Sequence, residues 1–148
     1  MRHARNDRPR EVLVVDDNPA DVHLLERAFA ALPDAPLVRA VEDAETALRY
    51  LRREGEHAGA LPPDLVLLDL HLPGRDGRSV LEEVKADPGL RWLPVVVLTT
   101  SNNPEDLKAC EQQHANAFVR KPFGLEGYRQ LAASLAAFWL RLARRSTD

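Results

Sequence analysis

The feature that most constrains the fold is an apolar run that ends abruptly in a carboxylate. Residues 64–68 read Asp-Leu-Val-Leu-Leu, Asp69 follows at once, and Pro73-Gly74 forces a turn shortly afterwards. A run that is apolar at successive positions, without alternation, is typical of a strand covered on both faces, as in a parallel sheet. Burying an isolated carboxylate is costly, so we expect Asp69 to lie at the exit of this strand, in a crevice that holds water or a cation.

Four further stretches have the pattern of strands, and helical patterns alternate with them. These strand candidates are residues 11–15, 37–41, 94–98 and 116–119. Helix starts are indicated at Asn18-Pro19, Asp43 and Asn103-Pro104, because such residues cap helices or fit their first turn. Strands that alternate with helices predict one parallel sheet with helices on both faces, joined by right-handed crossovers. The fold class expected from the pattern is therefore α/β.

The composition fits one ordinary globular domain. The chain has 148 residues and a formal net charge of −3, so we expect no bulk attraction to nucleic acid or to an anionic membrane. A single cysteine, Cys110, indicates a reducing compartment. No apolar run approaches the roughly 18 residues of a membrane span and we see no signal peptide, so a cytoplasmic location is expected. Residues 1–10 are predicted to be a flexible basic tail, and residues 11–148 a single domain without an output domain.

Reactive side chains follow four of the predicted strands. The first strand is followed by Asp16 and Asp17, the third by Asp69, the fourth by Thr99 and the fifth by Lys121. Because the carboxyl ends of parallel strands meet at one edge of a sheet, we expect these side chains to share a crevice. Three carboxylates this close repel one another, and a hard divalent cation, Mg²⁺ first, would relieve the repulsion. A carboxylate beside Mg²⁺, a hydroxyl and a lysine are the parts needed to transfer a phosphoryl group to an aspartate.

In combination these motifs resemble the receiver domain of two-component response regulators, from about Glu11 to Leu142. The resemblance rests on the acidic pair Asp16-Asp17, on Asp69 before Leu72-Pro73-Gly74 and Asp76-Gly77, on Thr99 after Val95–Leu98, and on Lys121-Pro122-Phe123. It implies a flavodoxin-like (βα)5 three-layer sandwich with a five-stranded parallel sheet and, here, an extended C-terminal helix.

The resemblance also implies a role for each acidic residue. Asp69 would accept a phosphoryl group from a sensor histidine kinase. Asp17 and Asp69 would bind Mg²⁺ directly, together with the backbone carbonyl of His71. Asp16 would bind the same ion through a water molecule.

Other positions would sense the phosphoryl group once it is attached. Thr99 and Lys121 would contact it, and Phe118 would follow Thr99 inward as an aromatic switch, although a plain core role for Phe118 fits equally well. The peptide bond before Pro122 is usually cis in the family, so a cis bond is predicted here. One residue departs from the family pattern, because Thr100 stands where a small Ala is frequent. Its β-branched side chain could narrow access to the phosphorylation site.

A narrower resemblance points to the stand-alone regulators that pair with bacterial and cyanobacterial phytochromes. It rests on four segments: residues 52–56, 70–77, 98–101 and 138–140. It implies a phytochrome-type kinase as partner and a phosphorylation-dependent surface around the fourth and fifth helices. The chain would then be a phosphoacceptor signalling protein rather than an enzyme.

Other functions remain open at this point. The chain could be an intermediate phosphate carrier in a multistep phosphorelay. An aspartyl-phosphate phosphatase of the haloacid-dehalogenase type is a weaker alternative, since His71 stands where those enzymes usually have a second Asp. A flavin carrier is disfavoured because no phosphate-binding Gly- or Ser/Thr-rich loop follows the first strand. A receiver that no longer responds to phosphorylation is disfavoured because the acidic, Thr and Lys set is complete.

The C-terminal helix is longer than the sheet requires. It is predicted to run from about Leu125 to the Arg144 region, which is roughly 30 Å at 1.5 Å per residue. Its apolar surface continues over Phe138, Trp139 and Leu142, and exposed large aromatics mark interfaces. We therefore expect a homodimer through this helix. The alternative is that the end of the helix folds back over its own core.

Overall fold

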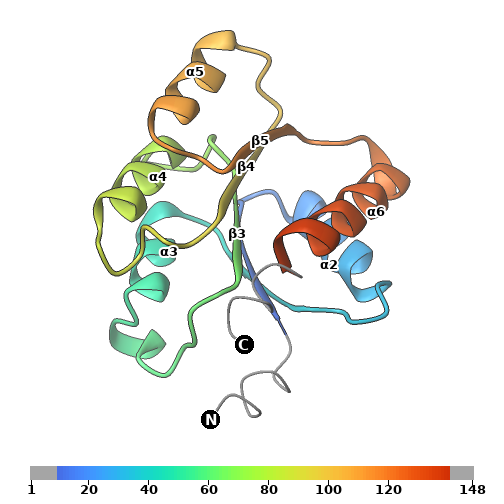
Figure 1. The fold of residues 1–148 in the computed structure, drawn as a ribbon, viewed down its shortest axis with the longest axis horizontal. Coiled ribbons are helices and arrows are strands. Elements are labelled where there is room, and N and C mark those ends of the chain that lie inside the picture. The colour runs from blue at the N-terminus through green and yellow to red at the C-terminus, as the bar shows by residue number, and fades with distance from the viewer. Residues whose placement is uncertain (1–9, 141–148) are drawn as a thin grey trace.

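The computed structural model describes residues 10–140 and has a five-stranded sheet at its centre (Figure 1). All strand pairs are parallel, and the strand order is β2-β1-β3-β4-β5. The strands are β1 (Glu11–Val15), β2 (Leu37–Val41), β3 (Leu65–Leu68), β4 (Val95–Thr99) and β5 (Ala117–Arg120). The predicted α/β class and all five predicted strands are confirmed, with ends that differ from the prediction by one residue at most.

Helices cover both faces of this sheet and make the fold a three-layer sandwich. They are α2 (Pro19–Ala30), α3 (Ala44–Leu51), α4 (Gly77–Ala86), α5 (Pro104–Gln112) and α6 (Gly124–Leu135). In Figure 1, α2 and α6 lie on one side of the sheet and α3, α4 and α5 on the other. This is the flavodoxin-like arrangement that the sequence predicted.

Two apolar layers explain why the central strands lack alternation. Leu13 and Val15 of β1 face the layer formed with α3, α4 and α5, whereas Val12 and Val14 face α2 and α6. Each of these four side chains is at most 1% exposed. A strand with apolar neighbours on both faces needs apolar residues at every position.

Polar caps fix where the helices begin. The Oδ1 of Asn18 accepts hydrogen bonds from the backbone N–H groups of Ala20 (3.0 Å) and Asp21 (3.2 Å), at the start of α2. Asp43 accepts one from the N–H of Thr46 (2.7 Å) at the start of α3. These bonds satisfy amide groups that have no partner inside the helix. Asn103 caps α5 in the same way, so all three predicted starts are confirmed.

The two ends of the described chain correct the prediction. The C-terminal helix is not one regular α-helix: α6 ends at Leu135, and a π-helical turn, η2 (Ala136–Leu140), continues it. The proposed interface residue Leu142 lies outside the described residues. At the other end, Arg10 was assigned to the tail but is buried, and its carbonyl accepts a hydrogen bond from the N–H of Leu37 (2.7 Å). Arg10 therefore packs as part of the described domain.

Candidate functional site

The strand order brings four strand ends together at one edge of the sheet. Asp16 follows β1, Asp69 follows β3, Thr99 ends β4 and Lys121 follows β5. Strands β1, β3, β4 and β5 are consecutive neighbours, so their carboxyl ends lie side by side. The chain winds one way from β1 to β2 and the other way from β3 onward, and such switch points are where α/β sheets bind ligands. The predicted crevice is confirmed.

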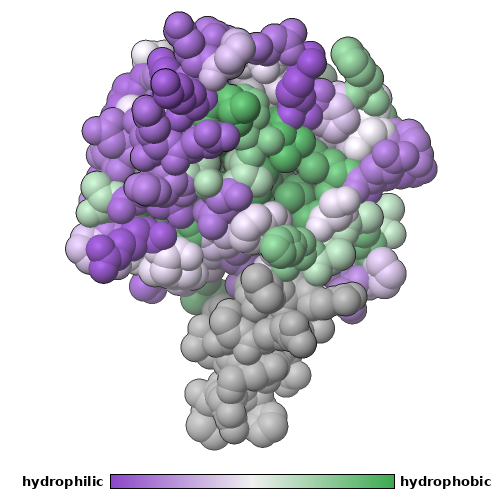
Figure 2. Space-filling model, turned by 45° about the horizontal axis from the view of Figure 1, so that its top comes forward, coloured by the Kyte–Doolittle hydropathy of each residue, from purple (hydrophilic) through white to green (hydrophobic). Residues whose placement is uncertain are grey.

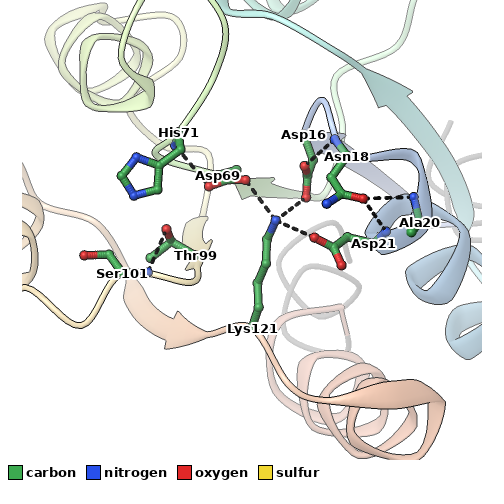
Figure 3. Close-up of polar contacts among 9 residues, drawn as sticks. All are labelled: Asp16, Asn18, Ala20, Asp21, Asp69, His71, Thr99, Ser101 and Lys121. Carbon is green, nitrogen blue, oxygen red and sulfur yellow. Dashed lines mark hydrogen bonds and ion pairs between the residues drawn. The ribbon is translucent and has the colours of Figure 1, made fainter.

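Lys121 lies at the centre of the site and contacts three carboxylates (Figure 3). Its Nζ lies 2.9 Å from Asp16 Oδ2, 2.8 Å from Asp21 Oδ2 and 2.9 Å from Asp69 Oδ2. The lysine side chain is only 6% exposed. Burial works against its charge, but the three carboxylates outweigh burial and raise the pKa of Lys121 above its ordinary value. The ammonium group is therefore a fixed positive charge in the crevice.

Asp16, Asp17 and Asp69 form the acidic cluster of the site. Each offers a carboxylate oxygen, and these oxygens all lie within 4.8 Å of one another. Asp16 and Asp69 are buried, whereas Asp17 is exposed. Burial raises the pKa of Asp16, and the Asn18 N–H and the Lys121 ammonium only partly oppose this effect. A cation would relieve this cost, and an all-oxygen donor set suits a hard divalent ion.

The two oxygens of Asp16 are already engaged, unlike the exposed carboxylate of Asp17. Asp16 Oδ1 accepts a hydrogen bond from the N–H of Asn18 (2.9 Å), and Oδ2 faces Lys121. An engaged carboxylate suits ligation through water, and an accessible one suits direct ligation. The acidic cluster thus fits a divalent ion, with different expected roles for the two neighbouring aspartates.

Backbone contacts hold Asp69 at the exit of β3. Its Oδ1 accepts a hydrogen bond from the N–H of His71 (3.0 Å), and the N–H of Gly77 donates to the Leu70 carbonyl (2.8 Å). The loop after Asp69 and the start of α4 are therefore tied together. A cavity of about 440 Å³ opens beside this loop. Its lining consists of Asp17, residues 70–74 and Asp76, which gives a ligand access to the acidic cluster.

Thr99 and Phe118 lie on neighbouring strands next to the crevice. Thr99 is fully buried, and its Oγ1 accepts a hydrogen bond from the N–H of Ser101 (3.3 Å). The Thr99 carbonyl also accepts one from the N–H of Lys121 (2.8 Å), which joins the ends of β4 and β5. Phe118 is partly buried against the α3–α5 side of the core. Thr100, the departure from the family pattern, is exposed.

Comparison with known proteins assigns the family. The model of the response regulator receiver domain matches residues 12–133. The chain belongs to this family. It is 36% identical over 132 residues to the response regulator Rcp1 from Synechocystis sp., with 89% of this chain and 90% of Rcp1 covered.

Solved receiver structures are similar throughout the described fold. The phosphorylated cyanobacterial phytochrome response regulator RcpA superimposes with a TM-score of 0.86 and 42% identity, covering 90% of this chain and 96% of RcpA. The Mn²⁺-bound form of Rcp1 superimposes with a TM-score of 0.82 and 36% identity, covering 89% of this chain and 95% of that one. The receiver fold and its resemblance to phytochrome response regulators are thus confirmed.

One prediction for this receiver domain is wrong. No peptide bond between residues 10 and 140 is cis, so the bond that joins Lys121 to Pro122 is trans. The prediction rested only on the cis bond that is usual in the family at this position. An X–Pro bond has only a small intrinsic preference between the two isomers.

Sequence reasoning also missed one residue of the receiver site. Asp21 was not among the residues expected at the site, yet its carboxylate contacts Lys121. Its place one helical turn after the cap Asn18, on the same edge as Asp16 and Asp17, was the signal that could have identified it.

Proposed function

We propose that this receiver domain accepts a phosphoryl group on Asp69 from a sensor histidine kinase. The observation that supports the proposal is the convergence of Asp69, the acidic pair and Lys121 at one edge of the sheet, beside the end of β4. Among the acids of that cluster, Asp69 alone follows the central strand β3. Its neighbours Asp16 and Asp17 are then left to bind a cation.

Phosphoryl transfer would proceed by direct displacement at phosphorus. A carboxylate oxygen of Asp69 forms the new P–O bond, and the P–N bond to the kinase histidine breaks. The electron pair of that bond returns to the imidazole nitrogen of the kinase. The ammonium of Lys121, now 2.9 Å from Asp69, is placed to pair with a phosphoryl oxygen. The buried hydroxyl of Thr99 is the expected hydrogen-bond donor to another.

A divalent cation, Mg²⁺ by preference, would neutralise phosphoryl oxygens during transfer. Asp17 and Asp69 would hold it directly with the backbone carbonyl of His71, and Asp16 would hold it through water. Rcp1, a relative of this chain, has a Mn²⁺-bound form. The acidic cluster and its all-oxygen chemistry support the same class of ion here.

The response to phosphorylation would spread through Thr99 and Phe118. When Thr99 turns toward the phosphoryl group it gives up its hydrogen bond with the Ser101 N–H, and the Phe118 ring moves into the space left behind. Phe118 packs on the side of the core that includes Cys110 of α5. The surface around β5 and the fourth and fifth helices of the chain, α5 and α6, would therefore change with phosphorylation.

A phytochrome-type histidine kinase is the proposed partner. RcpA is a cyanobacterial phytochrome response regulator, and it is 42% identical to this chain. Within residues 10–140, no helix is long and apolar enough to cross a membrane. We propose a cytoplasmic signalling protein that acts by contact with other proteins, without nucleic-acid binding or enzymatic turnover.

The proposed homodimer interface is the aromatic pair Phe138 and Trp139 on η2. Phe138 is 55% exposed, and its ring centroid lies 4.8 Å from that of Trp139. Trp139 packs partly against the α2–α6 side of the core, so it would anchor the pair while Phe138 makes the contact. Figure 2 shows hydrophobic residues gathered in the middle of one face, with hydrophilic ones to their left and above them. An exposed large aromatic side chain such as that of Phe138 supports an interface between two copies.

Phosphotransfer from a labelled kinase tests the proposal. A phytochrome-type histidine kinase is first autophosphorylated with labelled ATP and then mixed with the chain. We expect the label to move to the wild-type chain and not to the Asp69→Asn variant. Asp64→Asn is the matched control, because Asp64 lies at the opposite end of β3, where its side chain accepts a hydrogen bond from the Glu11 N–H. Equal labelling of the Asp69→Asn variant would refute the assignment of the phosphoacceptor.

A further inference from the structure

Asp21 is the one partner of Lys121 that does not belong to the acidic cluster. The Lys121 ammonium donates hydrogen bonds to Asp21 and Asp69 and forms an ion pair with Asp16. Asp16 and Asp69 are members of the cluster that fits a cation, whereas Asp21 is not. Asp21 therefore stays available to pair with Lys121 when a cation and a phosphoryl group engage Asp16 and Asp69.

The capping of α2 leaves the Asp21 side chain available for this contact. Asp21 is the third residue of the helix, where an acidic side chain often reaches back to the N–H of the cap residue. Here the N–H of the cap residue, Asn18, donates to Asp16 Oδ1 instead (2.9 Å). The Asp21 carboxylate is thus directed at Lys121, and its side chain is 21% exposed.

A buried phenol on α6 lies next to this pair without a well-formed hydrogen bond. Tyr128 is 1% exposed, and within the described part of the chain its hydroxyl has no partner at hydrogen-bond geometry. Burial is the main cause that raises the pKa of Tyr128. The charge of Asp21 and a weak hydrogen-bonding contact with it raise the pKa further, and Lys121 opposes the rise. The hydroxyl is therefore within electrostatic reach of both residues. A buried donor without an acceptor calls for an explanation.

We propose that Asp21 is a positioning residue for phosphoryl transfer and that Tyr128 is its second partner. Asp21 holds the Lys121 ammonium beside Asp69 in the resting protein. When Asp69 carries a phosphoryl group, the added negative charge draws Lys121 toward the phosphoryl oxygens. The Asp21 carboxylate then turns to Tyr128 and accepts a well-formed hydrogen bond from its hydroxyl, which the resting protein lacks. This inference rests on the proposed function, because it requires phosphorylation of Asp69.

This exchange, in which Asp21 changes partner from Lys121 to Tyr128, links the site to α6 through contacts other than those of Thr99 and Phe118. Tyr128 packs in the core layer that contains residues of α2 and α6. The same layer includes Trp139, which lies in the turn that continues α6. A new hydrogen bond at Tyr128 therefore acts on the helix that leads to the proposed dimer contact.

Nuclear magnetic resonance of labelled tyrosine tests the inference. The chain has two tyrosines, so a Tyr50→Phe background leaves Tyr128 as the single one. Carbon-13 at the ring carbon bonded to the hydroxyl reports its hydrogen bonding. The protein is phosphorylated with Mg²⁺ and acetyl phosphate, in which acetate leaves as the P–O bond to Asp69 forms. We expect the Tyr128 resonance to shift on phosphorylation, and the shift to be lost in Asp21→Ala.

Two further variants make the test specific. Glu26→Ala removes an exposed acid from the same helix, so the Tyr128 shift should persist. Asp21→Asn keeps the shape of the side chain and loses its charge, so the shift should shrink, and this variant serves if Asp21→Ala does not fold. Loss of the positioning contact should also slow phosphorylation at saturating acetyl phosphate, by roughly tenfold in Asp21→Ala.

The possible results separate this inference from the proposed function. If the intact mass shows phosphorylation but the Tyr128 resonance does not move, the exchange is wrong and the phosphoacceptor function stands. The same holds if the resonance moves equally in Asp21→Ala. If Asp69 gains no phosphoryl group at all, both the proposed function and the exchange are wrong.

Discussion

Replacing Gly77 with alanine should destabilise the fold and disturb the site together. Gly77 is the first residue of α4 and lies directly against the strand exit that carries Asp69. A Cβ at this position would lie 2.1 Å from the Asp69 carbonyl oxygen and 2.8 Å from the Leu70 Cα. Both neighbours are backbone atoms, so no side chain can move aside. Either α4 or the exit of β3 must shift.

The expected loss follows from two opposing effects. Gly→Ala inside a helix usually stabilises by up to about 1 kcal/mol. Overpacking costs roughly 1–3 kcal/mol, and a weakened hydrogen bond between the Gly77 N–H and the Leu70 carbonyl costs about 1 kcal/mol more. We therefore expect the free energy of unfolding to fall by about 2 kcal/mol in Gly77→Ala.

Urea unfolding followed by circular dichroism measures this change. Gly59→Ala is the matched control, because an added Cβ there has no neighbour within 4 Å. Its stability should stay within about 0.5 kcal/mol of wild type. Gly77→Ala should also be phosphorylated more slowly than Gly59→Ala, because Asp69 is displaced. If Gly77→Ala is as stable and as reactive as the control, the close approach of α4 to the strand exit is wrong.

Three other predictions concern the helix cap, the thiol and the aromatic surface. The hydrogen bond from the Thr46 N–H lowers the pKa of Asp43 below 3.8, so the ionised cap stabilises the fold above that pH. In urea unfolding, Asp43→Ala should lower the free energy of unfolding by about 1 kcal/mol at neutral pH. The loss should become smaller as the pH falls through the lowered pKa of Asp43. Burial raises the pKa of Cys110 to about 11, so a thiol reagent at pH 8 should react slowly until urea unfolds the chain, and fast reaction in the native state would contradict this. Light scattering should show a dimer for wild type and a monomer for Phe138→Ser. The control Trp92→Ser, which changes another exposed aromatic, should remain a dimer. A wild-type monomer at micromolar concentration would rule out the proposed dimer.

Much of the fold could be predicted from local patterns. Both faces of β1 and β3 are covered, so their apolar runs identified them as central strands of a parallel sheet. Asn18, Asp43 and Asn103 marked helix starts because a side-chain oxygen satisfies free amides there. These features depend only on neighbours in the sequence.

The strand order and the contacts across the site could not be read in the same way. The alternation of strands and helices along the chain does not show that β1 lies between β2 and β3. This strand order brings the residues of the site together. The contact of Asp21 with Lys121 joins residues 100 positions apart in the chain, and no local pattern reports it. The trans bond before Pro122 and the end of α6 at Leu135 likewise have no distinct signal in the local sequence.

The most direct test of the account is the intact mass of the chain after incubation with Mg²⁺ and acetyl phosphate. We expect the gain of one phosphoryl group in wild type and in the Asp64→Asn control. The gain should be absent in Asp69→Asn and absent when a chelator removes the divalent ion. No gain in wild type, or an unchanged gain in Asp69→Asn, would contradict the assignment of Asp69 as the phosphoacceptor.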